Sequence, residues 1–136
     1  MSETKSKITA KAADIEARLL ANRTQEVLRP AMLVDSAAGF ANKAIDLRII
    51  ELPPGSHSKN HRETREHIMY ILKGKGHSII NGEKHEWQEG DAVFVPTWAW
   101  HQFWNTDPER YARYLVATNL PMVRSLGLDR TEWAKE

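Results

Sequence analysis

Three histidines and one glutamate stand out as residues that could bind a metal ion. His61, Glu63 and His67 form one group, and His101 lies further along the chain. Imidazole and carboxylate together suit zinc and the first-row transition metals. Side chains alternate along a strand, so His61 and Glu63, two residues apart, would point to the same face. These residue types predict a metal centre as the place where the protein does its chemistry.

Glu66 is a competing carboxylate directly beside His67. A strand that starts one residue out of register has its faces reversed, and Glu66 would then point inward instead of His67. We take His67 as the ligand and keep Glu66 as the alternative, either to His67 or to Glu63.

The elements that must position these residues are short strands, which begin at about residue 31. Asn81-Gly82 between two of them is a strong hairpin signal. Close, regular strand spacing with turn residues between is typical of an all-β barrel or sandwich. The expected strands cover residues 45–50, 67–72, 77–80, 83–87, 92–95, 101–105 and 111–118.

The first 30 residues have a different pattern, with apolar residues at helical spacing that end at Arg29-Pro30. These residues are Ala12, Ile15, Leu19, Leu20, Val27 and Leu28. We therefore expect an N-terminal helical extension over residues 1–30 and a β-barrel over 31–120. Residues 121–136 would form a C-terminal tail, as a short helical or irregular cover.

Composition narrows the class of protein. A chain of 136 residues is long enough for one domain with a sizeable core. With 19 basic and 18 acidic residues, no strong field points to nucleic acid or a membrane as partner. The absence of cysteine excludes thiolate ligands and disulfides, and the polar N-terminus lacks the apolar stretch of a signal peptide. We expect a cytoplasmic protein.

The histidines and turns together resemble the two sequence motifs of the cupin family. The first motif spaces glycine, two histidines, glutamate and glycine as Gly55, His61, Glu63, His67 and Gly74 are spaced here. The second spaces glycine, proline, histidine and asparagine as Gly90, Pro96, His101 and Asn105 are spaced. The resemblance covers about residues 44–118. It implies a small double-stranded β-helix barrel in which His101 lies beside the first group.

The chain departs from this pattern at three positions. Glu63 stands where the second histidine is usual, His67 where the glutamate is usual, and Trp98 where the second motif has glycine. Residues 61–64 and 96–101 are most similar to gentisate 1,2-dioxygenase and related ring-cleaving cupins, which are longer and usually have two cupin halves. The resemblance therefore implies a single half with an iron-type site.

The activity that the resemblance implies is that of a metal-dependent oxidoreductase, a mononuclear dioxygenase. His61, Glu63, His67 and His101 would hold one divalent transition metal, with non-haem Fe(II) favoured and Mn, Ni, Cu or Zn as alternatives. The substrate would be a small aromatic or related unsaturated molecule that chelates the metal and reacts with O2. We also expect a homodimer, as is usual for cupins.

The same strands predict the residues that would surround a substrate. Alternation from His101 places Phe103 and Asn105 on its face of the strand, and alternation from His67 places Met69 inward. Arg48 could pair with a substrate carboxylate. Trp98 and Trp100 precede His101 and would form either the pocket rim or a subunit interface.

Two other functions fit the same residues. One is a redox-silent lyase, isomerase or hydratase, in which the metal acts as a Lewis acid. His57 or Tyr70 would then be the catalytic residue that moves a proton. The other is a cupin that binds a small molecule without turnover.

Overall fold

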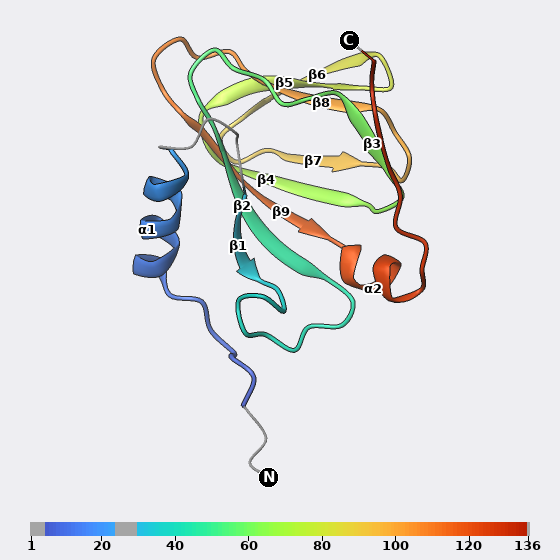
Figure 1. The fold of residues 1–136 in the computed structure, drawn as a ribbon. Helices are drawn as coiled ribbons and strands as arrows, with labels where there is room; N and C mark the ends of the chain where they lie inside the picture. Colours follow the sequence, from blue (N-terminus) through green and yellow to red (C-terminus); the bar gives the residue numbers. More distant parts are fainter. Residues whose placement is uncertain (1–4, 24–29, 136) are drawn as a thin grey trace.

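Two antiparallel sheets face each other and enclose the interior of the protein (Figure 1). The structure is a computed structural model and describes residues 5–23 and 30–135. In chain order the elements are α1 (Ala12–Asn22), β1 (Ala31–Val34), β2 (Asp46–Leu52), β3 (His61–Glu63), β4 (His67–Lys73), β5 (Lys75–Ile80), β6 (Glu83–Gln88), β7 (Ala92–Val95), β8 (His101–Asn105), β9 (Ala112–Thr118), α2 (Leu120–Ser125) and β10 (Thr131–Trp133).

The strand order shows how distant segments come together. The first sheet has the order β1-β2-β9-β4-β7, and the second has the order β10-β3-β8-β5-β6. This arrangement confirms the predicted all-β cupin barrel with an N-terminal helix. The β5–β6 hairpin turns at Asn81 and Gly82 with φ angles of 48° and 82°. Both lie in the left-handed region that this type of two-residue turn requires.

Apolar side chains from both sheets fill the space between them. Met69 and Ile71 are almost fully buried there, as the alternation from His67 predicts. Trp87 and Tyr114 meet edge to face, with ring centroids 6.4 Å apart. This packing makes the barrel a filled core whose strands are rigid supports for the side chains they carry.

A second, smaller core lies outside the barrel, where α1 covers part of the first sheet (Figure 1). Leu19 packs there with Ala31, Leu33 and Ile49. β2 therefore carries apolar side chains on both faces, with Ile49 in this outer core and Leu52 in the barrel core. Of the expected helical residues, Ile15 is partly buried and Leu20 exposed, whereas Val27, Leu28 and Arg29 lie outside the described residues.

Ion pairs fix the same helix on the sheet. Glu51 is buried on β2 and accepts hydrogen bonds from Arg23 at 3.0 and 2.8 Å. Arg113 on β9 bonds to Glu51 at 3.2 Å and to Glu16 of α1 at 2.6 Å. The buried carboxylate therefore has two guanidinium partners, which offset the cost of removing its charge from water.

The C-terminal segment contains more regular secondary structure than the predicted short helical or irregular cover. The short helix α2 agrees with that prediction, but β10 forms a further strand at the edge of the second sheet, next to β3. Among the described residues, no helix is both long and apolar enough to span a bilayer.

Truncating the buried leucine of α1 tests how the helix is attached. Leu19 is 2% exposed and its neighbour Leu20 is 59% exposed. Leu19→Ala should lower the free energy of unfolding by about 2–5 kcal/mol, because it leaves a cavity against the sheet. Leu20→Ala is the matched control and should cost less than about 1 kcal/mol. Urea denaturation followed by circular dichroism measures both, and equal losses would contradict this packing.

Candidate metal centre

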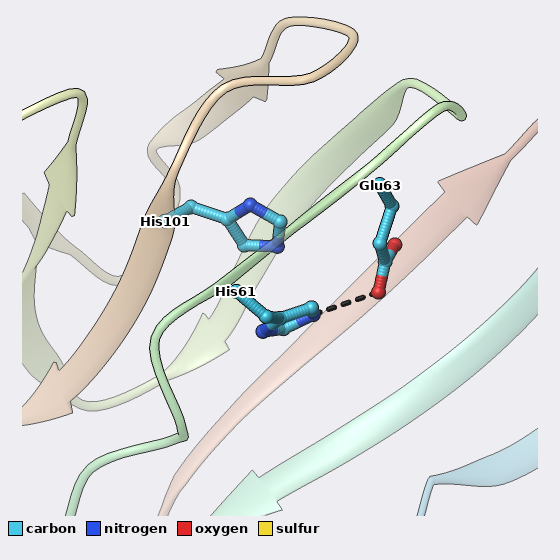
Figure 2. A group of neighbouring side chains, drawn as sticks. All are labelled: His61, Glu63 and His101. Atoms are coloured by element: carbon cyan, nitrogen blue, oxygen red, sulfur yellow. Dashed lines mark ion pairs between the residues drawn. The ribbon is translucent and has the colours of Figure 1, made fainter. Parts of the chain in front are cut away.

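The strands β3 and β8 bring three of the expected ligands together. His61 and Glu63 lie two residues apart on β3, and His61 pairs directly with His101 on β8. Residues opposite each other in an antiparallel pair project from the same face. Figure 2 shows the three side chains converging, with Glu63 turned toward the ring of His61. Glu63 and His101 are buried, and His61 is partly buried.

The separations between these side chains suit a single ion. Nε2 of His61 lies 2.7 Å from Oε1 of Glu63, and the rings of His61 and His101 have centroids 4.3 Å apart. One ligand atom from each of the three residues lies within 4.8 Å of the others. Ligands about 2.1 Å from an ion lie about 3 Å apart at right angles and about 4 Å apart when opposite. The group therefore needs little rearrangement to close around a cation.

Backbone carbonyls orient both imidazoles of this group. Nδ1 of His61 lies 2.9 Å from the carbonyl oxygen of Lys59, and Nδ1 of His101 lies 2.9 Å from that of Ala99. A carbonyl oxygen only accepts, so each Nδ1 carries the hydrogen. This leaves Nε2 of each ring as the atom for a metal, and the carbonyl contacts are the outer support that metal-binding histidines usually have.

His67 approaches the same carboxylate from the facing sheet. Its Nε2 lies 3.0 Å from Oε2 of Glu63, whereas its Nδ1 is buried and has no hydrogen-bond partner among the described residues. His67 is not in the group whose ligand atoms all lie within 4.8 Å. Glu66 is exposed, and its backbone N–H donates to the side chain of Asn119. The register of β4 thus turns His67, and not Glu66, toward the cluster.

The charges of the cluster are those that a metal site requires. Burial would raise the pKa of Glu63, but hydrogen bonds from His61, His67 and Arg65 outweigh it and hold that pKa well below its usual range. Burial lowers the pKa of His101 to about 4 and also lowers the pKa of His67. At neutral pH the carboxylate is ionised and these two imidazoles are neutral, which is the state that binds metals.

The donor set therefore fits a divalent transition metal. Glu63 and the Nε2 atom of His61 present lone pairs to each other at 2.7 Å, so a proton or a metal ion must lie between them. Two imidazoles and one carboxylate on neighbouring strands match the ligand type of non-haem iron sites.

Four of the predicted pocket residues, Met69, Phe103, Arg48 and Asn105, lie on interior faces. Met69 is part of the core, and the ring of Phe103 lies 5.8 Å from that of His101. Arg48 points inward from β2 and donates to Asp46 at 2.9 Å, while its Nε is buried and has no partner in the part of the chain that the structure describes. The interior next to the cluster therefore has an apolar floor and the guanidinium of Arg48.

Asn105 is inside the barrel but has a different role from the predicted one. Its amide nitrogen donates to the carbonyl oxygens of Leu52, Pro53 and Arg110, and its oxygen accepts the N–H of Asp107. These bonds use both amide hydrogens and one lone pair of the oxygen, so the side chain holds the surrounding turns.

Trp98 and Trp100 lie on the outer side of β3, away from the cluster, whereas residues of a pocket rim would lie beside it. Both rings contact Arg62, with its guanidinium carbon 4.4 and 4.6 Å from their centroids. Arg62 alternates with His61 and Glu63 on β3 and so points outward. The two tryptophans therefore cover the outer face.

The two predicted proton carriers are also on outer faces. His57 contacts Gln102 at 3.0 Å and lies against the ring of Trp104 at 4.1 Å, and both partners alternate with the inward-facing His101. Tyr70 alternates with the buried Met69 and is 47% exposed. The structure does not bring either side chain to the cluster, because Tyr70 lies on the outer face of β4 and His57 lies against the outer face of β8.

Two contacts of the cluster are not among those predicted from the sequence. Arg65 bonds to Glu63, and Trp133 of β10 stacks on His61. The alternating charges of residues 62–66 gave a weak hint of the first, whereas no local pattern indicates that residue 133 returns to β3.

A cavity of about 490 Å³ opens between β6 and β7, at the edges of the two sheets. Ile80, Trp87 and Val93 form its apolar walls, and His85 and Asp91 are among its polar residues. None of the cluster residues lines it. Ile80 pairs with His101 across β5 and β8, so this wall lies beside the strand that carries a candidate ligand.

Comparisons with known proteins agree with this architecture. The chain is 33% identical over 81 residues to 5-aminosalicylate 1,2-dioxygenase of Comamonas sp., a match that covers 60% of this chain and 21% of the relative. It is 40% identical over 58 residues to 1-methylthio-D-xylulose 5-phosphate methylsulfurylase of Rhodospirillum rubrum, over 43% of this chain and 37% of that protein. The chain thus spans well under half of either relative.

Solved structures show the same fold. Salicylate 1,2-dioxygenase of Pseudoaminobacter salicylatoxidans, with gentisate, superimposes with a TM-score of 0.75 at 17% identity, covering 91% of this chain and 35% of that one. The family model described as a cupin domain matches residues 48–118, which include every residue of the cluster. The chain therefore belongs to the cupin family.

Proposed function

We propose that this cupin is a mononuclear non-haem Fe(II) dioxygenase for a small aromatic substrate that chelates the metal. The observation that carries the proposal is the group of His61, Glu63 and His101, two imidazoles and a carboxylate within 4.8 Å of one another. This ligand type, with open positions, is that of oxygen-activating iron sites. His67, 3.0 Å from Glu63, would be the fourth ligand.

A bound ferrous ion would supply open coordination positions for substrate and dioxygen together with the electrons that activate dioxygen. The protein's part is to hold the ligand atoms in place and to exclude water. The carbonyls of Lys59 and Ala99 do the first, because they fix the ring orientation of His61 and His101. Met69 and Phe103 support the second, because they make the adjacent interior apolar.

Arg48 would recognise a carboxylate on the substrate. It lies on the interior face of β2 and is 14% exposed, and its charge contributes to lowering the pKa of nearby His67. No group within residues 5–23 and 30–135 bonds to its Nε, so an oxyanion beside the cluster could accept a charge-assisted hydrogen bond there. A small aromatic acid combines this group with the apolar ring that the floor favours.

The relatives support the same substrate class. 5-Aminosalicylate 1,2-dioxygenase and the solved salicylate 1,2-dioxygenase are both, by name, dioxygenases of aromatic acids. The matched region is a single cupin domain, and it contains the residues assigned here to metal and substrate.

The match to a methylsulfurylase favours one alternative. That relative is named for a phosphorylated sugar derivative and not for an aromatic ring. A redox-silent reaction with a Lewis-acid metal at the same cluster is therefore the second candidate. It differs from the first in needing no oxygen.

Oxygen uptake separates the two functions. Protein loaded anaerobically with Fe(II) should consume O2 when gentisate, salicylate or 5-aminosalicylate is added, one O2 for each ring cleaved. Zn(II)-loaded protein should be inactive, because zinc has no redox chemistry to offer. An oxygen electrode and absorbance spectra of the product measure both. Turnover under argon, or activity kept with zinc, would reject the dioxygenase and support the alternative.

Removal of a ligand tests the metal site itself. His101→Ala should reduce bound iron from about one per chain to near zero, measured by mass spectrometry of metals after desalting. His85→Ala is the matched control, because His85 is exposed on β6. His67→Ala should weaken binding by about 10-fold or more if His67 is a ligand. Wild-type iron content in His101→Ala would contradict the assignment.

Substitution of Arg48 tests substrate recognition. Arg48→Met should raise KM for an aromatic acid by about 10–100-fold, since a bond between charged groups contributes about 1.5–3 kcal/mol. Arg124→Met changes the same residue type at a site that is 68% exposed and should leave KM unchanged. Steady-state oxygen uptake gives both values. An unaltered KM in Arg48→Met would remove Arg48 from the site.

A further inference from the structure

The C-terminal strand lies against the strand that carries two candidate ligands. β10 pairs with β3 in antiparallel register, with Trp133 opposite His61 and Thr131 opposite Glu63. Directly opposed residues share a face of the sheet. Trp133 therefore projects to the same side as His61, beside the cluster, although it lies 70 or so residues further along the chain.

The indole of Trp133 stacks on the imidazole of His61. The ring centroids are 4.7 Å apart and the planes are inclined by 26°. Trp133 is 57% exposed, so the stacked face is covered by His61 while much of the ring remains accessible. The ammonium group of Lys59 lies 5.9 Å from the same indole. Lys59 thus contacts this pair twice, since its carbonyl also accepts from His61 at 2.9 Å.

Contacts on both sides of Trp133 hold this strand in place. Glu132 accepts two hydrogen bonds from Arg62, at 3.1 and 2.8 Å. Ala134 donates its N–H to the carbonyl of Asn60 at 3.0 Å. Thr64 and Arg130 exchange two further bonds at 3.1 and 2.9 Å. An edge strand with these attachments can hold an indole at a defined position, which an unattached chain end could not.

From this geometry we propose that Trp133 is a positioning residue that fixes the ring plane of His61 and so directs its Nε2 at the metal. Three contacts then restrict the imidazole: the Lys59 carbonyl at Nδ1, Glu63 at Nε2 and the indole on the ring face. The first two leave the ring free to tilt about the line between its nitrogens, and the stacked indole opposes that motion. The proposal rests on the metal site proposed above.

Cobalt(II) binding tests the role of Trp133. Co(II) is a spectroscopic substitute for Fe(II), and as a paramagnetic ion it quenches tryptophan fluorescence at short range. Wild-type protein should bind one Co(II) with quenched emission. Trp133→Ala should bind it about 10-fold more weakly, as is typical when a metal ligand loses its outer support. Trp133→Phe should keep most of the affinity, since a phenyl ring can still stack, but should lose the largest share of the quenching.

Trp104→Phe is the matched control, because Trp104 lies on the outer face against His57 and should change neither affinity nor most of the quenching. The thermal unfolding midpoint of each variant shows that it is folded.

A metal-free readout is the ring-proton NMR shift of His61, which should lose its ring-current displacement in Trp133→Ala. Wild-type affinity and an unmoved His61 signal in Trp133→Ala would overturn the proposed role of Trp133 and leave the metal site standing. Failure of wild-type protein to bind Co(II) would instead overturn the metal site together with it.

Discussion

The pairing of His61 with His101 is the constraint on which the site depends. It joins β3 to β8, and it is the register contact between these strands. A shift by one residue would turn Arg62 inward and both His61 and Glu63 outward. Because β3 has only three residues, its neighbours must hold it in register. β10 supplies three paired positions along its other edge, and the N–H of Trp98 donates to the carbonyl of Glu63 at 2.8 Å.

The buried carboxylate of Glu63 organises the charges around this pairing. It is 4% exposed and accepts hydrogen bonds from His61, His67 and Arg65, so an anion in the interior has cationic or polar partners on each oxygen. A divalent ion would take over much of this compensation. Arg65 would still balance charge from outside the coordination sphere, which helps to explain why a glutamate can occupy the place of the usual histidine.

Much of the fold could be predicted from the sequence, because strand alternation and turn residues are local signals. Asn81-Gly82 forms the expected turn, and His67, Met69 and Ile71 point inward as expected. Trp98 has a φ of 64°, which explains why glycine is usual at its position in the motif. Contacts between distant segments could not be predicted in this way. The return of Trp133 to His61, the position of Trp98 and Trp100 around Arg62, and the use of Asn105 by three carbonyls each depend on tertiary packing.

A crystal structure of Fe(II)-loaded protein, with anomalous data collected at the iron edge, would test the central claim most directly. The account predicts one anomalous peak about 2.0–2.2 Å from Nε2 of His61, Nε2 of His101 and an oxygen of Glu63. No peak between β3 and β8, or a peak only at exposed histidines such as His85, would contradict it.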